Sequence, residues 1–103
     1  MPVFAVTTGK GANWGPCRGN REQPYWEEHA AFADGLVDRG VIVLGGPIGG
    51  GEDDDIALLA VEAASEEAAR SAFDADPWTM HQVFRIKRVQ PWTAWLDGRA
   101  GRQ

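Results

Sequence analysis

A length of 103 residues is close to the commonest size of one protein domain, and we expect a single domain over residues 1–103. Hydrophobic residues make up 44% of the chain, which is too many for a disordered protein, yet no apolar run approaches the roughly 20 residues that span a bilayer. The net charge of −5 argues against a nucleic-acid-binding protein, because such proteins concentrate Lys and Arg on one face. Neither a membrane nor a nucleic acid is therefore expected as a partner.

The first part of the chain predicts a strand, a long loop and a helix. The strand covers Val3–Thr8, which is rich in β-branched and aromatic residues and stops at a glycine. The loop covers Gly9–Gln23 and is long for a compact domain. The helix includes Pro24 in its first turn and ends at Gly40, a common C-terminal cap. At about 100° per residue, one helix face collects apolar side chains and one histidine: Tyr25, Trp26, His29, Phe32, Ala33 and Leu36.

Two strands joined by a glycine-rich turn follow. Val41–Leu44 is a continuous apolar strand, which we expect to be closed by Gly45-Gly46-Pro47. Ile48–Asp55 is a glycine-rich and then acidic turn, and consecutive carboxylates in a turn are usually solvated. Ile56–Glu62 is the returning strand.

A second helix and a fourth strand complete the pattern. Ser65 is the expected N-cap of this helix. Pro77 is expected to end it, which places Asp76 in its last turn. There the carboxylate opposes the helix dipole unless a cationic or hydrogen-bonded neighbour offsets it. Val83–Val89 is predicted as the fourth strand.

The order strand, helix, strand, strand, helix, strand is the split βαβ pattern of ferredoxin-like folds. We therefore predict an α+β domain of βαββαβ design with an antiparallel sheet. Its core covers about residues 3–92, and a polar tail follows at Asp97–Gln103.

The central strands also predict a homodimer. The segments VIVL (41–44) and IALLAV (56–61) do not alternate apolar and polar residues, as a strand with one wet face should. Two helices cover only one face of the sheet, so a second copy is the economical cover for the other. In the alternative, Pro91–Leu96, a short turn or helix containing Trp92 and Trp95, folds back over the open face.

Two features predict a cytoplasmic protein. The N-terminus, Met1-Pro2-Val3-Phe4, lacks the basic segment of a secretion signal. Cys17 is the single cysteine, so the chain has no internal disulfide, as is usual in a reducing compartment.

Several residues in this order resemble the YCII-related family. They are His29, Gly40, Gly46-Pro47, Asp76-Pro77-Trp78 and Val89-Gln90-Pro91-Trp92, and the match runs from about Val3 to Trp92. The resemblance implies a dimeric α+β barrel with a cleft on each subunit. It also implies that His29 and Asp76 correspond to a histidine and an aspartate proposed as the active pair of the family. One branch is associated with dehydrochlorination of a chlorinated hydroxyquinone.

The chain departs from the family in its long loop, Gly9–Gln23, and at His81, where many relatives carry a small residue. We expect the loop to reshape the mouth of the cleft.

The chemistry of His29 and Asp76 is compatible with two interpretations. An imidazole titrates near neutrality and suits a general acid or base, and an aspartate would orient it and stabilise its protonated form. Alternatively, His29 is a core histidine that bonds a backbone carbonyl, and Asp76 is an ordinary turn former before a proline.

Other residues are candidates for the lining of a pocket beside this pair. Trp78, Trp14 and Tyr25 would supply aromatic walls, although aromatic residues at helical spacing more often belong to the core. Gly46 and Pro47 would allow a close approach of backbone at a strand end. No phosphate-loop motif and no spacing typical of a metal site is present, so we expect neither a cofactor nor a metal.

The leading hypothesis is a cofactor-independent enzyme, a lyase or isomerase that acts on a small cyclic or aromatic molecule, with the dehydrochlorinase as one example. His29 would move the proton, Asp76 would orient it, and Trp78 and Gly46 would shape the pocket. The alternatives are a small-molecule binding or sensing module without catalysis, a structural partner protein, and a cofactor-free oxygenase on the same barrel design.

Overall fold

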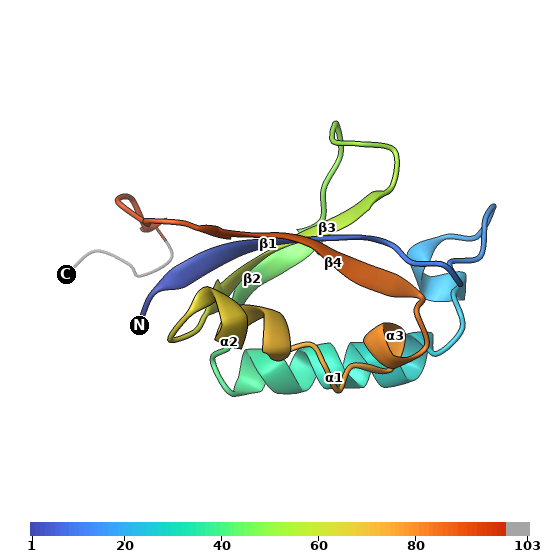
Figure 1. Ribbon diagram of the computed structural model, residues 1–103, viewed down its shortest axis with the longest axis horizontal. Coiled ribbons are helices and arrows are strands. Elements are labelled where there is room, and N and C mark those ends of the chain that lie inside the picture. Colours follow the sequence, from blue (N-terminus) through green and yellow to red (C-terminus); the bar gives the residue numbers. More distant parts are fainter. Residues whose placement is uncertain (99–103) are drawn as a thin grey trace.

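A four-stranded antiparallel sheet carries three α-helices on one of its faces (Figure 1). The computed structural model describes residues 1–98. The elements in chain order are β1 (Val3–Lys10), the 3₁₀ helix η1 (Asn20–Glu22), α1 (Trp26–Asp38), β2 (Ile42–Pro47), β3 (Asp55–Glu62), α2 (Glu66–Ser71), α3 (Pro77–Met80) and β4 (Phe84–Pro91). The strand order is β2-β3-β1-β4, with β1 antiparallel to both β3 and β4. The predicted α+β, ferredoxin-like fold is therefore confirmed.

The two caps predicted from the sequence form as expected. Gly40 has a φ of 75°, a conformation that costs glycine little. Its N–H donates to the carbonyl of Val37, and the N–H of Val41 donates to that of Leu36, which together close α1 with a Schellman motif. The hydroxyl of Ser65 accepts the N–H of Ala68 at 3.1 Å and begins α2.

The edge strand β2 is longer than predicted. Gly45, Gly46 and Pro47 do not close the strand but belong to it, and they pair with Leu59, Leu58 and Ala57 of β3. Glycine and proline are tolerated here because β2 has a neighbour on one side only.

Neither Pro24, expected in the first turn of a helix, nor Pro77, expected to end one, has the predicted role. Pro24 precedes α1 instead of lying in its first turn, because Tyr25 adopts a left-handed conformation and the helix begins at Trp26. Pro77 does not end α2, which already stops at Ser71. Instead it is the first residue of a separate short helix, α3.

The hydrophobic core lies between the sheet and the helices. Alternate side chains of β1, those of Phe4, Val6 and Thr8, face the helical layer and are buried. Leu36 of α1 and Trp78 of α3 pack onto them, and both are almost fully buried. Burial of one large apolar side chain contributes about 1.5–3 kcal/mol, so this layer holds the elements of the site together.

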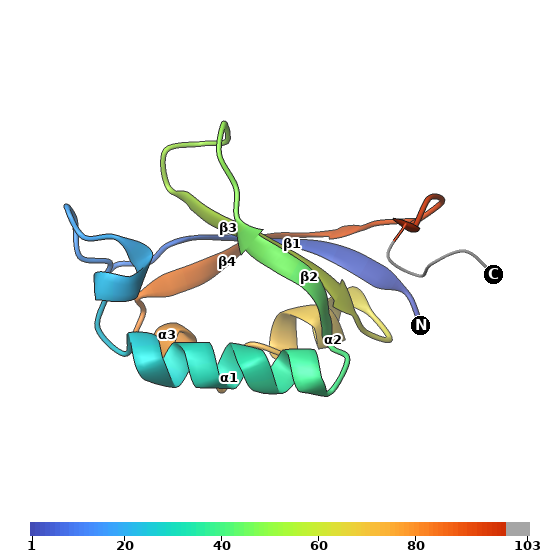
Figure 2. The same cartoon turned by 180° about the vertical axis from the view of Figure 1, so that it is seen from behind.

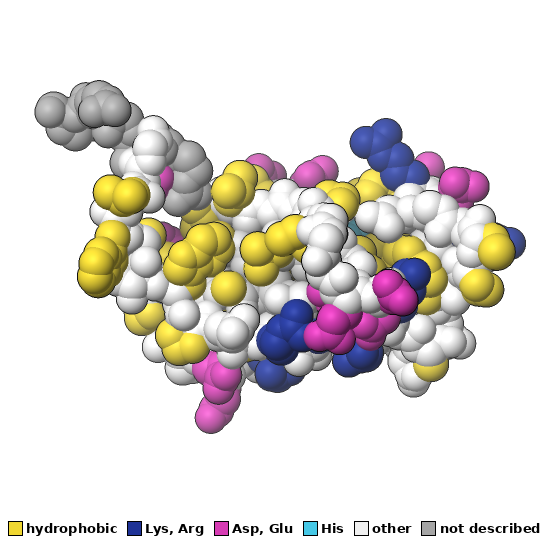
Figure 3. Space-filling view, turned by 90° about the horizontal axis from the view of Figure 1, so that it is seen from above, with side chains coloured by type: hydrophobic (Ala, Val, Ile, Leu, Met, Phe, Trp, Pro, Cys, Tyr) yellow, Lys and Arg dark blue, Asp and Glu magenta, His cyan; other side chains and the backbone are white. Residues whose placement is uncertain are grey.

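The opposite face of the sheet has no helix of residues 1–98 over it in either view of the ribbon (Figures 1 and 2). Leu44 of β2 is 60% exposed, and Trp92, just after β4, is 44% exposed. Figure 3 looks onto this face and shows hydrophobic side chains gathered over part of it. The homodimer that would cover this surface stays a prediction.

Up to residue 98, the C-terminal segment does not cover the open face. Trp95 is 87% exposed and Leu96 is 95% exposed. Of the turn or helix predicted over residues 91–96, Pro91 instead ends β4, the N–H of Trp92 donates to the carbonyl of Val3, and the chain bends at residue 95 without forming a helix over 92–96. The predicted polar tail lies mostly outside the described residues, at 99–103.

Among residues 1–98, no helix combines the length and the apolar character needed to cross a membrane. The cytoplasmic location stays a prediction from the sequence.

Candidate active site

His29 of α1 and Asp76, which precedes α3, meet although 47 residues separate them in the chain. The Nδ1 atom of His29 lies 2.8 Å from Oδ2 and 3.0 Å from Oδ1 of the carboxylate. The side chain of Asp76 is 1% exposed and that of His29 is 16% exposed. A carboxylate this close to Nδ1 accepts the N–H of that nitrogen. The other ring nitrogen, Nε2, then has no bond to Asp76 and is available to a ligand.

Asp76 is the N-cap of α3 and does not lie in the last turn of the preceding helix. Its Oδ1 accepts the backbone N–H of Trp78 at 2.9 Å, and Pro77 occupies the first helical position. The expected conflict with a helix dipole was therefore wrong, because the carboxylate lies at the start of a helix. Capping holds the buried carboxylate in place independently of His29.

Trp78 fixes the plane of the imidazole. Its ring stacks on that of His29 with 3.8 Å between the centroids and 2° between the planes, and Phe84 contacts the imidazole edge-on at 5.3 Å. The indole N–H of Trp78 donates to the carbonyl of Pro24 at 2.8 Å.

The long loop before α1 is held in place by the side chain of Gln23, which is 3% exposed. Its Oε1 accepts the N–H of Gly15 at 2.7 Å, and its Nε2 donates to the carbonyls of Gly15 and Arg18 at 2.9 and 3.0 Å. These bonds close the loop just before the carbonyl that Trp78 binds. Sequence reasoning missed Gln23, because an isolated amide in a glycine-rich loop has no recognisable pattern.

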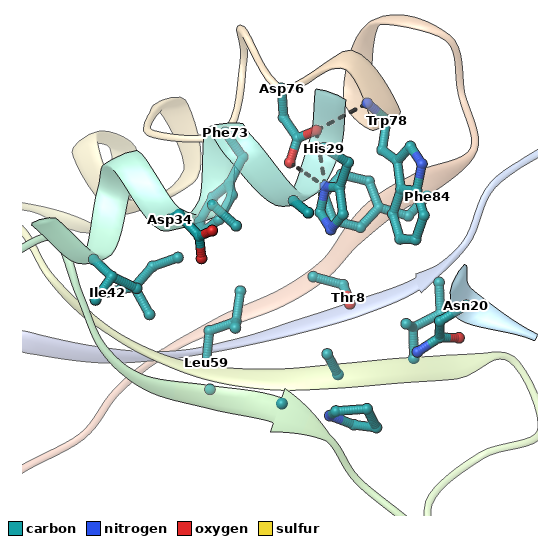
Figure 4. A pocket seen from close by; sticks show the side chains of 18 of the residues that line it. Thr8, Asn20, His29, Asp34, Ile42, Leu59, Phe73, Asp76, Trp78 and Phe84 are labelled. Carbon is teal, nitrogen blue, oxygen red and sulfur yellow. Dashed lines mark hydrogen bonds and ion pairs between the residues drawn. The ribbon is translucent and has the colours of Figure 1, made fainter. Parts of the chain in front are cut away.

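A cavity of about 500 Å³ lies between α1 and the sheet, below the imidazole of His29 (Figure 4). Figure 4 shows one ring nitrogen of His29 bonded to Asp76 and the other turned toward Thr8. This volume is within the range of small-molecule sites. The walls are mainly apolar, and the side chains that supply them include Trp26, Ile42, Leu59, Phe73, Trp78 and Phe84. The polar side chains on the lining are Thr8, Asn20, His29, Asp34 and Asp76.

The predicted pocket residues separate into two groups. Trp78, Gly46 and Pro47 line the cavity. Trp14 and Tyr25 do not: Trp14 packs edge-on behind Trp78 at 5.7 Å between centroids, and Tyr25, 42% exposed, stacks on His81. The left-handed backbone of Tyr25 lies before the first turn of α1.

The acidic turn before β3 is ion-paired, where solvated carboxylates were expected. The ammonium group of Lys87 lies 2.8 Å from Asp54, 2.5 Å from Asp55 and 3.2 Å from Glu52, and the Lys87 side chain is only 6% exposed. Hydrogen bonds from Lys87 lower the pKa of Asp54 and of Asp55 below the ordinary value. In turn, hydrogen bonds to Asp54 and Asp55 raise the pKa of Lys87. Among residues 1–98, no group of three or more histidine, cysteine or acidic side chains is arranged to hold a metal ion.

No protein-family model matches this chain, and no curated protein matches it in sequence. A solved structure does resemble it: the 5-chloro-2-hydroxyhydroquinone dehydrochlorinase TftG from Burkholderia phenoliruptrix AC1100, in complex with 2,5-dihydroxybenzoquinone. The two chains are 26% identical with a TM-score of 0.57, and the match covers 88% of this chain and 93% of that one.

Proposed function

We propose that this protein is a cofactor-independent enzyme that moves protons on a small, oxygen-substituted ring, with His29 as its acid–base group and Asp76 as the residue that orients it. The observation that carries the proposal is the 2.8 Å contact between Nδ1 of His29 and the buried carboxylate of Asp76, above a largely apolar cavity. A general base needs a free ring nitrogen, a fixed orientation and a stabilised conjugate acid. Asp76 provides the last two and leaves Nε2 for the substrate.

Loss of HCl from a chlorinated trihydroxybenzene is a reaction that such a site suits. Two hydroxyl protons leave the ring, one of them returns to the chlorine-bearing carbon, and chloride departs with the electron pair of its bond. The ring becomes a quinone without an external oxidant, because the departing chloride takes the electrons. His29 is able to accept and to return protons, and the stacked indole of Trp78 stabilises the imidazolium between these steps.

The resemblance to TftG supports this reaction class, since that protein is a dehydrochlorinase and its structure holds a quinone. We extend the likeness to the proposal that this chain belongs to the YCII-related family. The His29–Asp76 contact, the adjoining Trp78 and the cavity that all three line support that assignment.

The direct test is release of chloride from 5-chloro-2-hydroxyhydroquinone, measured with excluded oxygen so that spontaneous oxidation of the ring does not contribute. Stoichiometric chloride and quinone support the dehydrochlorinase reaction. Oxygen consumption under air, with no chloride released under nitrogen, would instead indicate a cofactor-free oxygenase. Thermal stabilisation by 2,5-dihydroxybenzoquinone without turnover would indicate the binding or sensing module.

We also propose that a second copy of the chain covers the open face of the sheet. Leu44 and Trp92 expose apolar surface there, and the described C-terminal segment leaves both uncovered. Exposed apolar surface of this kind marks interaction sites, and two-fold dimers are the commonest assemblies.

A further inference from the structure

Thr8 carries a hydroxyl group that the fold buries and does not use. The residue is fully buried on β1, and Oγ1 has no hydrogen-bond partner. A buried polar atom without a partner loses its bonds to water and gains nothing in exchange. A valine would fill the same space without that cost, so the presence of a hydroxyl needs another explanation.

The position of Thr8 at the wall of the cavity supplies one. Thr8 continues the face of β1 that carries Phe4 and Val6 toward the helices, and it lies among the residues that line the cavity. Figure 4 shows Thr8 on the sheet side of the cavity and His29 on the helix side. The backbone of Thr8 is already paired with Ala57 on one side and Ile86 on the other.

We propose that Thr8 is a substrate-binding residue, whose hydroxyl hydrogen-bonds a ring oxygen of the molecule on which His29 acts; this rests on the function proposed above. A hydroxyl both donates and accepts, so it can pair with a phenol, a phenolate or a quinone carbonyl. The substrate class that fits is a planar ring with at least two oxygen substituents, one directed toward His29 and another toward Thr8. Apolar walls from Trp78 and Phe84 flank such a ring.

The pairing also determines specificity. A ring with an oxygen at the Thr8 position satisfies the buried hydroxyl, whereas a ring without that oxygen leaves it unpaired. Sites that bind a substrate oxygen in this way reject analogues lacking the oxygen much more strongly than an apolar pocket would.

Thr79 provides a matched control. Its Oγ1 is the other buried side-chain oxygen without a partner among residues 1–98, but Thr79 does not line the cavity. Removal of an unpaired hydroxyl at Thr79 should therefore have no effect on ligand binding.

The test measures binding of 2,5-dihydroxybenzoquinone by calorimetry, and thermal unfolding without ligand, for Thr8→Val, Thr8→Ser and Thr79→Val. All variants carry Cys17→Ser, because the exposed thiol of Cys17 would otherwise react with a quinone. We expect Thr8→Val to be as stable as the parent protein or more so, and to bind the quinone about tenfold more weakly, as loss of one hydrogen bond implies. Thr8→Ser keeps the hydroxyl and should bind within about threefold of the parent protein, and Thr79→Val should bind equally well.

Three results would overturn the inference, and they are distinguishable. If the parent protein binds the quinone and Thr8→Val binds it equally well, Thr8 has no role in binding but the proposed function stands. If Thr8→Val is less stable than the parent protein and binds normally, the hydroxyl has a structural role. If the parent protein does not bind the quinone at all, the proposed substrate class fails and this inference fails with it.

Discussion

The imidazole of His29 lies flat on the indole of Trp78, with 3.8 Å between the ring centroids and an angle of 2° between the planes. The stack sets the tilt of the imidazole, and the bond from Nδ1 to Asp76 sets its rotation within that plane. Trp78 is itself held by its backbone N–H on Asp76 and its indole N–H on Pro24. The direction of Nε2 is therefore fixed before a ligand enters, which is the geometry that the proposed acid–base role requires.

Asp76 caps α3 and has a second, proposed role in orienting His29, and substitution separates the two. Asn caps a helix about as well as Asp does, so Asp76→Asn should keep the free energy of unfolding within about 1 kcal/mol of the unaltered protein. It removes the negative charge that, in the proposed mechanism, stabilises the imidazolium of His29, so kcat should fall by at least about tenfold. Asp76→Ala removes the cap as well and should cost a further 0.5–2 kcal/mol or so in urea unfolding. An Asp76→Asn variant with unchanged kcat would show that the charge of Asp76 is not needed.

The ion-paired cluster around Lys87 predicts how stability depends on pH. Because the pKa values of Asp54 and Asp55 are lowered in the folded state, their contribution is complete above the unfolded value of about 3.9 and is lost as the pH falls below it. Because the pKa of Lys87 is raised, its contribution is complete below about pH 10.4 and is lost as the pH rises beyond that value. Urea unfolding between pH 2 and 7 should show the acid limb directly.

Asp55→Asn should flatten this acid limb, because one of the shifted carboxylates no longer titrates. Asp53→Asn is the matched control, since Asp53 lies in the same turn and is exposed. The two variants should differ at pH 7 and converge near pH 2. Identical curves for both variants across this range would mean that the cluster does not stabilise the fold.

The proposed homodimer predicts a mass in solution of twice the 11.2 kDa of the chain. Leu44→Glu places a charge on the open face and should shift the equilibrium to the monomer at micromolar concentration. Met80→Glu changes an equally exposed side chain on α3, on the helical side of the sheet, and should leave the dimer intact. Light scattering after size-exclusion chromatography measures both, and a monomeric parent protein would refute the proposal.

Much of the fold could be predicted from the sequence because the signals are local. The apolar period of α1, its end at Gly40 and the cap at Ser65 each depend on a few neighbouring residues. Pro77 was misread because proline both ends helices and begins them, and only the tertiary structure shows that α2 has already stopped at Ser71. The extension of β2 through Gly45–Pro47 likewise depends on its position at the edge of the sheet.

The candidate site could be predicted only in part, because its members come together through the fold. His29 stood out as an imidazole on an apolar helix face, but nothing local indicates that a residue 47 positions away contacts it; the family resemblance suggested that partner. Thr8 did leave a signal: it occupies the position after Phe4 and Val6 on the buried face of β1, where another apolar residue is expected. Gln23 left none.

The most direct test of the central claim compares chloride release from 5-chloro-2-hydroxyhydroquinone by the unaltered protein, His29→Gln and His81→Gln. His81 is the other histidine, stacks on Tyr25 and lies outside the cavity, so it controls for the loss of an imidazole. If His29 transfers the proton, His29→Gln should stay folded and lose about 10²–10⁴-fold in kcat, whereas His81→Gln should match the unaltered protein. Full activity in His29→Gln would contradict the account.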